Sequence, residues 1–258
     1  MKTFAYVAFA AALAILLAST TNISYGSYAV TNLNTTVLLN PNTSASVKEV
    51  LTVYISNESI QQYSTDRIAL NLTLSEWQSL IGPMLTQHII NPKLGVYNFR
   101  MLPGAVTRKG SGGEAYILMS YNVPNVTSVE QTGPRSFRYS FNPNVLNFEH
   151  GASGEVLPAN TTLNIVIPAG ASITSVYPVP DSPASGITNN YMNVTEVSWF
   201  YGEPLSKFTL TFVITESLQE EVARAFEGVY AYLGIFSYVI IALVILLFII
   251  YAYVKAGR

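Results

Sequence analysis

Apolar and polar residues alternate along much of the middle of the chain, most clearly at 45–55. In this stretch, ASVKEVLTVYI, one face of an extended strand would carry every second residue, namely Val47, Glu49, Leu51, Val53 and Ile55. The sequence NPNTS at 40–44 is typical of a turn and separates this strand from the β-prone run before it. Residues 35–55 therefore predict a β-hairpin.

Short runs of the same kind recur after residue 94. They are rich in β-branched and aromatic residues and are separated by Gly, Pro and Asn. They cover residues 95–102, 114–123, 135–141, 161–167, 171–177, 194–200 and 207–215. This spacing predicts a mainly β fold with an antiparallel β-sandwich-type domain over residues 27–216, and it leaves open whether that domain is one large unit or two small ones.

A short helical insertion interrupts the β pattern after residue 72. Thr73 and Glu76 have the spacing of a capping box, in which each side chain accepts a hydrogen bond from the other residue's backbone. Apolar residues follow at helical spacing, and Gly82-Pro83 ends the helix. A second short helix over 83–89 would also fit the sequence.

The C-terminal segment is the most apolar part of the chain. A second capping box begins at Ser217, and no residue from Gly228 to Val254 is charged. A bilayer core about 30 Å thick needs about 20 such residues. We therefore predict one long helix, juxtamembrane over 217–232 and a single transmembrane span over 233–254. Lys255 and Arg258 would hold the tail at 255–258 in the cytoplasm.

The N-terminus predicts a signal peptide over residues 1–26. Lys2 gives a basic start, and residues 4–18 form an apolar run too short for an ordinary span. An uncleaved signal anchor is the alternative. Both readings place the β domain outside the cytoplasm, so the expected protein is a single-pass plasma-membrane protein with lipid around its span.

Eight glycosylation sequons and the lack of cysteine bear on the compartment. The sequons begin at Asn22, Asn34, Asn42, Asn57, Asn71, Asn125, Asn160 and Asn193. All lie between the two apolar segments, which predicts an extracellular glycoprotein. The chain has no cysteine, so disulfides, thiolate metal sites and cysteine nucleophiles are excluded. Dense sequons without disulfides are an arrangement that suits an archaeal surface protein.

The chain is poor in side chains for catalysis. It has only two histidines. Its formal net charge is −2, and the sequence contains no basic stripe of the kind that binds nucleic acid. Glu149 and His150 adjoin, with Ser153 nearby, but neighbours on a strand point to opposite faces. His88 is expected at a partly exposed helix end. A metal site joining both histidines to Glu149 lacks a spacing motif. No catalytic, cofactor or metal site is predicted.

Two segments carry a family resemblance. The hairpin VLLNPNTSASVKEV and the later segment LNIVIPAGASITSVYP resemble uncharacterised archaeal single-span surface proteins with a β-rich ectodomain. That resemblance implies a location and a fold, and it carries over no catalytic residue.

The expected function is a non-enzymatic binding or structural module of the cell envelope with a protein partner. The alternative is an accessory subunit of a membrane enzyme or secretion complex. A hydrolase of envelope polymers is less favoured.

Overall fold

The computed structural model describes residues 28–69, 72–91, 95–151, 154–182, 194–234 and 236–256. The predicted signal peptide therefore lies outside the described residues, as do Ser153 and three of the sequon asparagines (Asn22, Asn71 and Asn193). The chain is mainly β, as the alternating pattern predicts, and its strands form three separate sheets.

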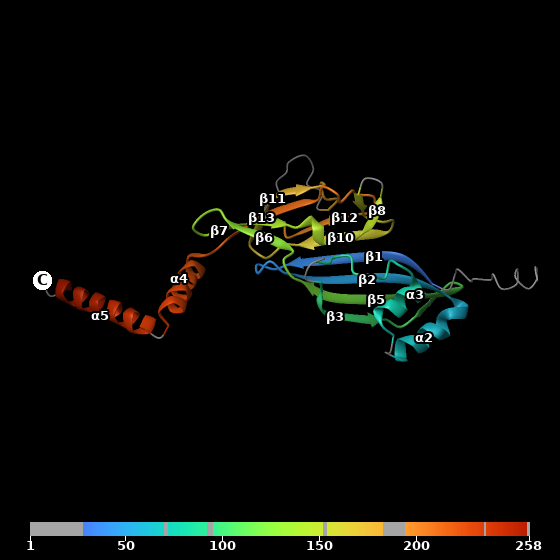
Figure 1. Ribbon diagram of the computed structural model, residues 1–258, viewed down its shortest axis with the longest axis horizontal. Coiled ribbons are helices and arrows are strands. Elements are labelled where there is room, and N and C mark those ends of the chain that lie inside the picture. Colours follow the sequence, from blue (N-terminus) through green and yellow to red (C-terminus); the bar gives the residue numbers. More distant parts are fainter. Residues whose placement is uncertain are drawn as a thin grey trace, which may run out of the picture.

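The larger sheet has seven strands, in the order β12-β10-β1-β2-β5-β3, and β4 also pairs with β5 (Figure 1). Its strands are β1 (Tyr28–Leu39), β2 (Ala45–Ser56), β3 (Tyr97–Pro103), β4 (Thr107–Lys109), β5 (Gly112–Val123), β10 (Thr161–Val166) and β12 (Glu196–Trp199). The predicted hairpin is confirmed as β1 and β2, which pair antiparallel around the turn at 40–44. The pairing of β1 with β10 is parallel, so the expectation of a purely antiparallel fold is wrong.

The smaller sheet has the strand order β11-β13-β7-β6. Its strands are β11 (Ala171–Tyr177), β13 (Thr209–Thr215), β7 (Ser136–Phe141) and β6 (Thr127–Gln131), and a separate ribbon joins β8 (Glu149–Gly151) to β9 (Gly154–Val156). Aromatic rings connect the two sheets. The ring centroid of Phe208 lies 4.9 Å from that of Trp199 on β12 and 5.4 Å from that of Phe141 on β7. The two sheets therefore share one buried core.

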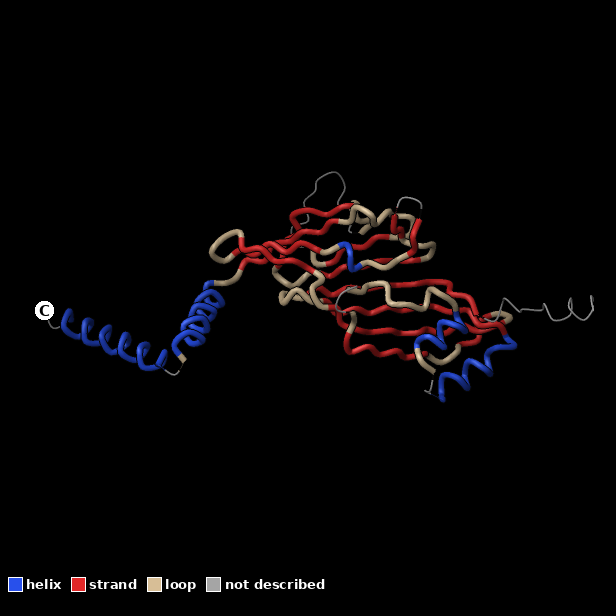
Figure 2. Tube along the Cα trace, in the orientation of Figure 1, coloured by secondary structure: helices blue, strands red, loops and turns tan. Residues whose placement is uncertain are grey.

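Short helices lie at the end of the larger sheet opposite the C-terminal segment (Figures 1 and 2). They are η1 (Asn57–Ser59), α2 (Ile60–Ala69) and α3 (Leu74–Ile81), and the 3-10 turn η2 (Pro143–Val145) follows later in the chain. The capping box of α3 is confirmed, because Glu76 N donates to Thr73 Oγ1 at 3.3 Å and Thr73 N donates to Glu76 Oε2 at 2.7 Å. Sequence reasoning missed α2, whose Tyr63 ring packs 5.5 Å from that of Trp77 on α3.

The C-terminal segment corrects the fold prediction. It forms two helices, α4 (Leu218–Leu233) and α5 (Phe236–Ala256), and they meet at an angle in Figure 1. Gly234 has φ +56°, in the left-handed region that ends helices and that glycine adopts at little cost. The prediction of one continuous helix is therefore wrong. Among the described residues, no helix combines the length and hydrophobicity that crossing a membrane requires, which contradicts the predicted span over 233–254.

Candidate functional site

A carboxyl group lies buried in the middle of the larger sheet. Glu49 is on the core-facing side of β2 and is fully buried. In the sheet its cross-strand neighbours are Thr35 on β1 and Met119 on β5, both also fully buried. A carboxyl group in such surroundings is costly unless every oxygen has hydrogen-bond partners. What Glu49 contacts therefore defines the site.

Three donors converge on the Glu49 carboxyl group. The His88 backbone N–H donates to Oε1 at 2.9 Å, and His88 Nδ1 lies 2.8 Å from Oε2. The Tyr121 hydroxyl donates to Oε1 in a very short hydrogen bond. Because Oε2 accepts the contact from Nδ1, the hydrogen of the neutral imidazole resides on Nδ1. Nε2 is then left as the hydrogen-bond acceptor of the ring.

Tyr121, on β5, also holds the Glu49 carboxyl group and the backbone next to His88 in place. Its hydroxyl donates to Glu49 and accepts a hydrogen bond from the Ile89 N–H at 3.0 Å. Burial, and then the neighbouring Glu49 carboxylate, raise the pKa of Tyr121 far above its ordinary value, so the phenol keeps its proton. Glu49 and Tyr121 together hold the backbone of residues 88 and 89 against the sheet.

The residues on the other side of His88 also hold it in place. Its ring stacks on that of Phe148, with centroids 5.1 Å apart. Its carbonyl oxygen accepts from the backbone N–H of Asn147 at 2.7 Å, and the Asn147 side chain donates to the carbonyl of Gln87 at 3.0 Å. The imidazole is therefore fixed in orientation before any ligand arrives.

A cavity of about 360 Å³ opens beside the fixed imidazole. Its lining combines apolar side chains with a few polar groups, and consists of Pro83, Met84, Thr86, His88, Asn147, Phe148, Glu149 and Pro158. Only 4% of the His88 side chain is exposed. Within the part of the chain that the structure describes, Nδ1 of this ring is hydrogen bonded and Nε2 is not. A mixed lining around a few fixed polar groups is typical of small-ligand sites.

The expectations for the histidines change accordingly. Residues 83–89 form turns instead of a second helix, and His88 is buried instead of partly exposed. Glu149 lines the cavity, whereas the His150 ring is 72% exposed and lies 3.7 Å from Glu155. Burial raises the pKa of Glu155, and His150 offsets part of that rise. Glu149 and His150 thus diverge, as alternation along β8 predicts. In the described residues, no group of three or more His, Asp or Glu side chains could hold a metal ion.

Sequence reasoning missed Glu49 and His88 as a pair. The signal was present at position 49, where a charged residue occupies the apolar face of the alternating strand. Nothing in the sequence indicates which donor would reach it, because His88 lies 39 residues away.

The sequon asparagines occupy several kinds of position. Among the described ones, Asn42 and Asn160 lie in turns, Asn125 lies in the loop between β5 and β6, and Asn57 begins η1. All four are exposed. Asn34 lies on the exposed face of β1, where its Oδ1 accepts from Asn164 Nδ2 at 2.7 Å. These placements leave the predicted glycosylation open to a direct test.

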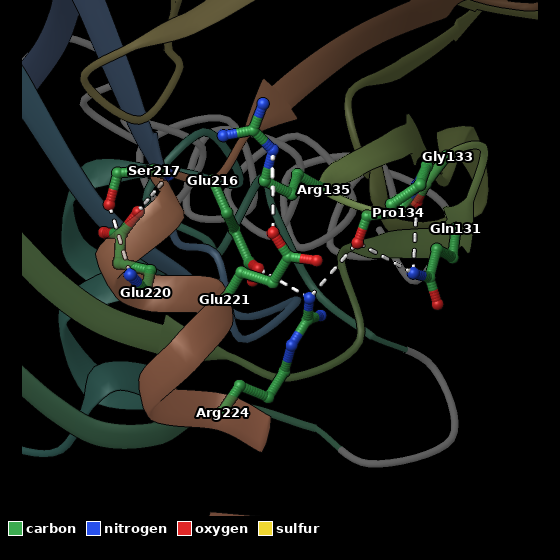
Figure 3. Close-up of polar contacts among 9 residues, drawn as sticks. All are labelled: Gln131, Gly133, Pro134, Arg135, Glu216, Ser217, Glu220, Glu221 and Arg224. Carbon is green, nitrogen blue, oxygen red and sulfur yellow. Dashed lines mark hydrogen bonds and ion pairs between the residues drawn. The ribbon is translucent and has the colours of Figure 1, made fainter. Parts of the chain in front are cut away.

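A second polar cluster joins α4 to the smaller sheet, and we call it the α4 clamp. It consists of Pro134, Arg135, Phe137, Glu216, Glu221 and Arg224. Figure 3 shows the Arg224 guanidinium reaching back to Glu216, 2.7 Å away, and to the carbonyl of Pro134, at 3.4 Å. The same guanidinium lies 4.7 Å from the centre of the Phe137 ring, and Arg135 lies 3.7 Å from Glu221. The clamp is at the surface and holds the first turns of α4 against the loop between β6 and β7.

Comparisons with known proteins add little to this geometry. No protein-family model and no curated protein matches the chain. Among solved structures, the NMR structure of the folded domain of the Mycobacterium tuberculosis protein LppM aligns over 76% of this chain and 96% of its own. Sequence identity is 9% and the TM-score is 0.27, values at which the likeness carries no argument. The resemblance to archaeal surface proteins stays a prediction.

Proposed function

We propose that this protein is a non-enzymatic binding module of the cell envelope, and that its ligand binds in the cavity beside His88. One observation carries the proposal: Glu49 fixes the His88 imidazole through Nδ1, and the same side chain lines a cavity that combines apolar and polar groups. Fixed polar groups within apolar walls bind a ligand in one orientation. The sequons and the lack of cysteine support a location outside the cytoplasm.

The residues around the cavity favour binding over catalysis. The Glu49–His88 pair resembles the base half of a nucleophilic triad, which also needs a nucleophile within hydrogen-bond reach of the free ring nitrogen. In the described residues, Nε2 has no such hydroxyl contact, and Thr86 is the one hydroxyl-bearing side chain of the lining. Among the described residues, a fixed imidazole with no hydroxyl in contact with Nε2 favours the binding of a ligand.

The binding test places a photo-reactive amino acid at Thr86, on the cavity lining, in the full chain in its producing cells. The matched control places the same amino acid at Ser172, which is exposed on β11. After illumination, mass spectrometry of the purified protein should find a discrete adduct at position 86 only. Adding H88Q should abolish that adduct. Equal adducts at both positions, or none, would contradict the proposal.

The location has a separate test. Lys109 has a side chain that is 69% exposed, so a membrane-impermeant amine reagent should label it in intact cells if the β domain faces outward. Peptide mass spectrometry of the same sample should find glycan on exposed sequons such as Asn42 and Asn125. Labelling that requires permeabilised cells, together with bare sequons, would overturn the extracytoplasmic location.

A role as accessory subunit of a larger complex is the second candidate. It is favoured by α5, which exposes many large apolar side chains, among them Phe236, Leu243 and Leu247. An exposed apolar surface of that kind is typical of a contact with another apolar surface. Cross-linking in intact cells, followed by purification of the tagged protein, should then recover a stoichiometric protein partner. Recovery of the folded chain alone would exclude an obligate subunit.

A further inference from the structure

We infer that the cavity beside His88 binds a ligand with a primary ammonium group attached to a short apolar body. This inference rests on the proposed function, since it names the class of ligand for the same cavity. It follows from the kinds of polar atoms that the lining offers, from their charges and from the position of the apolar side chains.

The free polar atoms of the cavity are mainly acceptors. With its hydrogen on Nδ1, the His88 ring presents Nε2 as an acceptor. The Asn147 side chain uses its amide nitrogen to donate to Gln87, so its Oδ1 is the atom left to a ligand. The Glu149 carboxylate is an acceptor only, and the Thr86 hydroxyl serves either role. A ligand that satisfies these atoms must bring several donors.

The charge around the cavity points the same way. The Glu149 carboxylate is on the lining, whereas no lysine or arginine lines the cavity in the described part of the chain. Carboxylates without a balancing cation favour a positively charged ligand and disfavour an anionic one. An ammonium group brings three donors and one positive charge, which matches both requirements.

The apolar part of the ligand has its own contacts. Met84, Phe148 and Pro158 line the cavity together with the polar groups. The Phe148 ring stacks on the His88 imidazole, so the alkyl part of a ligand bound at Nε2 would lie beside an aromatic side chain. A free metal cation would leave these apolar contacts unused, whereas an alkylammonium group uses both kinds of surface.

The probe experiment uses the full chain labelled with ¹⁵N in histidine only. Because the chain has two histidines, an H150Q variant leaves a single labelled imidazole, that of His88, whose Nε2 signal is followed. At pH 8, n-butylammonium should shift the Nε2 signal in a saturable way in the millimolar range. The isosteric probes n-butanol and butyrate should bind at least roughly tenfold more weakly, since one lacks the charge and the other has the opposite sign.

Two variants on the β8–β9 ribbon sharpen the test. E149Q removes the carboxylate on the lining and should weaken butylammonium binding roughly 1.5- to 5-fold, the range of one exposed charge pair. E155Q, on the strand paired with β8 and outside the lining, should leave the affinity unchanged.

If butanol or butyrate binds with the same affinity as butylammonium, the ammonium class is overturned, although the cavity remains a binding site. An E149Q variant that binds as well as the parent would also overturn it. A response to none of the three probes overturns the ammonium class too, and the adduct at position 86 then decides separately whether the cavity binds another class of ligand.

Discussion

The Glu49 cluster and the α4 clamp are built from similar groups in opposite surroundings. Glu49, His88 and Tyr121 are all buried, and the carboxyl group has three donors. In the clamp the Arg224 side chain is 41% exposed and the Arg135 side chain 45%. Water therefore reaches both guanidinium groups of the clamp, whereas it does not reach the Glu49 carboxyl group. A carboxyl group in this protein is therefore structurally decisive only where water cannot replace its partners.

The largest expected effect comes from removing the buried carboxyl group. E49A leaves the His88 N–H, His88 Nδ1 and the Tyr121 hydroxyl without their acceptor. Breaking such a buried group costs about 3–5 kcal/mol of unfolding free energy. Urea unfolding followed by tryptophan fluorescence measures this loss. K48A, on the exposed face of the same strand, is the matched control and should change stability by less than about 0.5 kcal/mol. Similar losses in both variants would contradict the central role of Glu49.

Removing one donor should cost less. Y121F keeps the ring and deletes the hydroxyl, so Glu49 loses one donor and the Ile89 N–H loses its acceptor. We expect a loss of about 1–3 kcal/mol, the cost of leaving buried polar groups unpaired. Y116F deletes an exposed hydroxyl that donates to Glu114 from the same strand, and it should be nearly neutral. The difference between the two midpoints in urea tests the burial argument.

The clamp should contribute little to stability. R224A removes one exposed ion pair and one cation–π contact, each worth about 0.5–1 kcal/mol or less. Its main effect should be on orientation, measured as a broader distribution of distances between spin labels on α4 and β7. R138A, on β7, breaks an exposed pair with Glu130 outside the clamp and should leave that distribution unchanged. Equally narrow distance distributions in R224A and R138A would show that the clamp does not hold α4.

The smallest effect is a pH dependence at the start of α4. Hydrogen bonds from the backbone and side chain of Ser217 hold the pKa of Glu220 below its ordinary value of 4.5. The stabilisation is therefore complete above pH 4.5 and is lost as the pH falls through the lower pKa of the folded state. Hydrogen exchange of the Ser217 amide should accelerate over that window relative to E220Q, which has no titrating group there. If the Ser217 amide exchanges with the same pH profile in the parent chain and in E220Q, the stabilising role of this cap is contradicted.

Local chemistry explains which parts of the fold could be predicted from the sequence. The β1–β2 hairpin and the capped start of α3 depend on residues close together in the chain, and both are confirmed. The parallel pairing of β1 with β10 joins Leu33 to Thr161, and no local pattern encodes a contact at that separation. The helix break at Gly234 is hard to predict for another reason. Apolar composition indicates where a helix can form, while the left-handed φ of one glycine decides where it ends.

The candidate site was less predictable than the fold. Glu149 and His150 adjoin in sequence, but of the two only Glu149 lines the cavity. The decisive pair, Glu49 and His88, comes from a strand and from a turn that packs on the sheet. A charged residue on an apolar strand face indicates that a partner must exist. Identifying that partner requires the three-dimensional packing.

The most direct measurement is the tautomer of His88, from long-range ¹H–¹⁵N spectra of the histidine-labelled H150Q chain. If Glu49 fixes the imidazole as the structure has it, the neutral ring carries its hydrogen on Nδ1 and leaves Nε2 unprotonated beside the cavity. A ring protonated on Nε2 would contradict this arrangement, and with it both the orientation of the binding site and the preference for ammonium ligands.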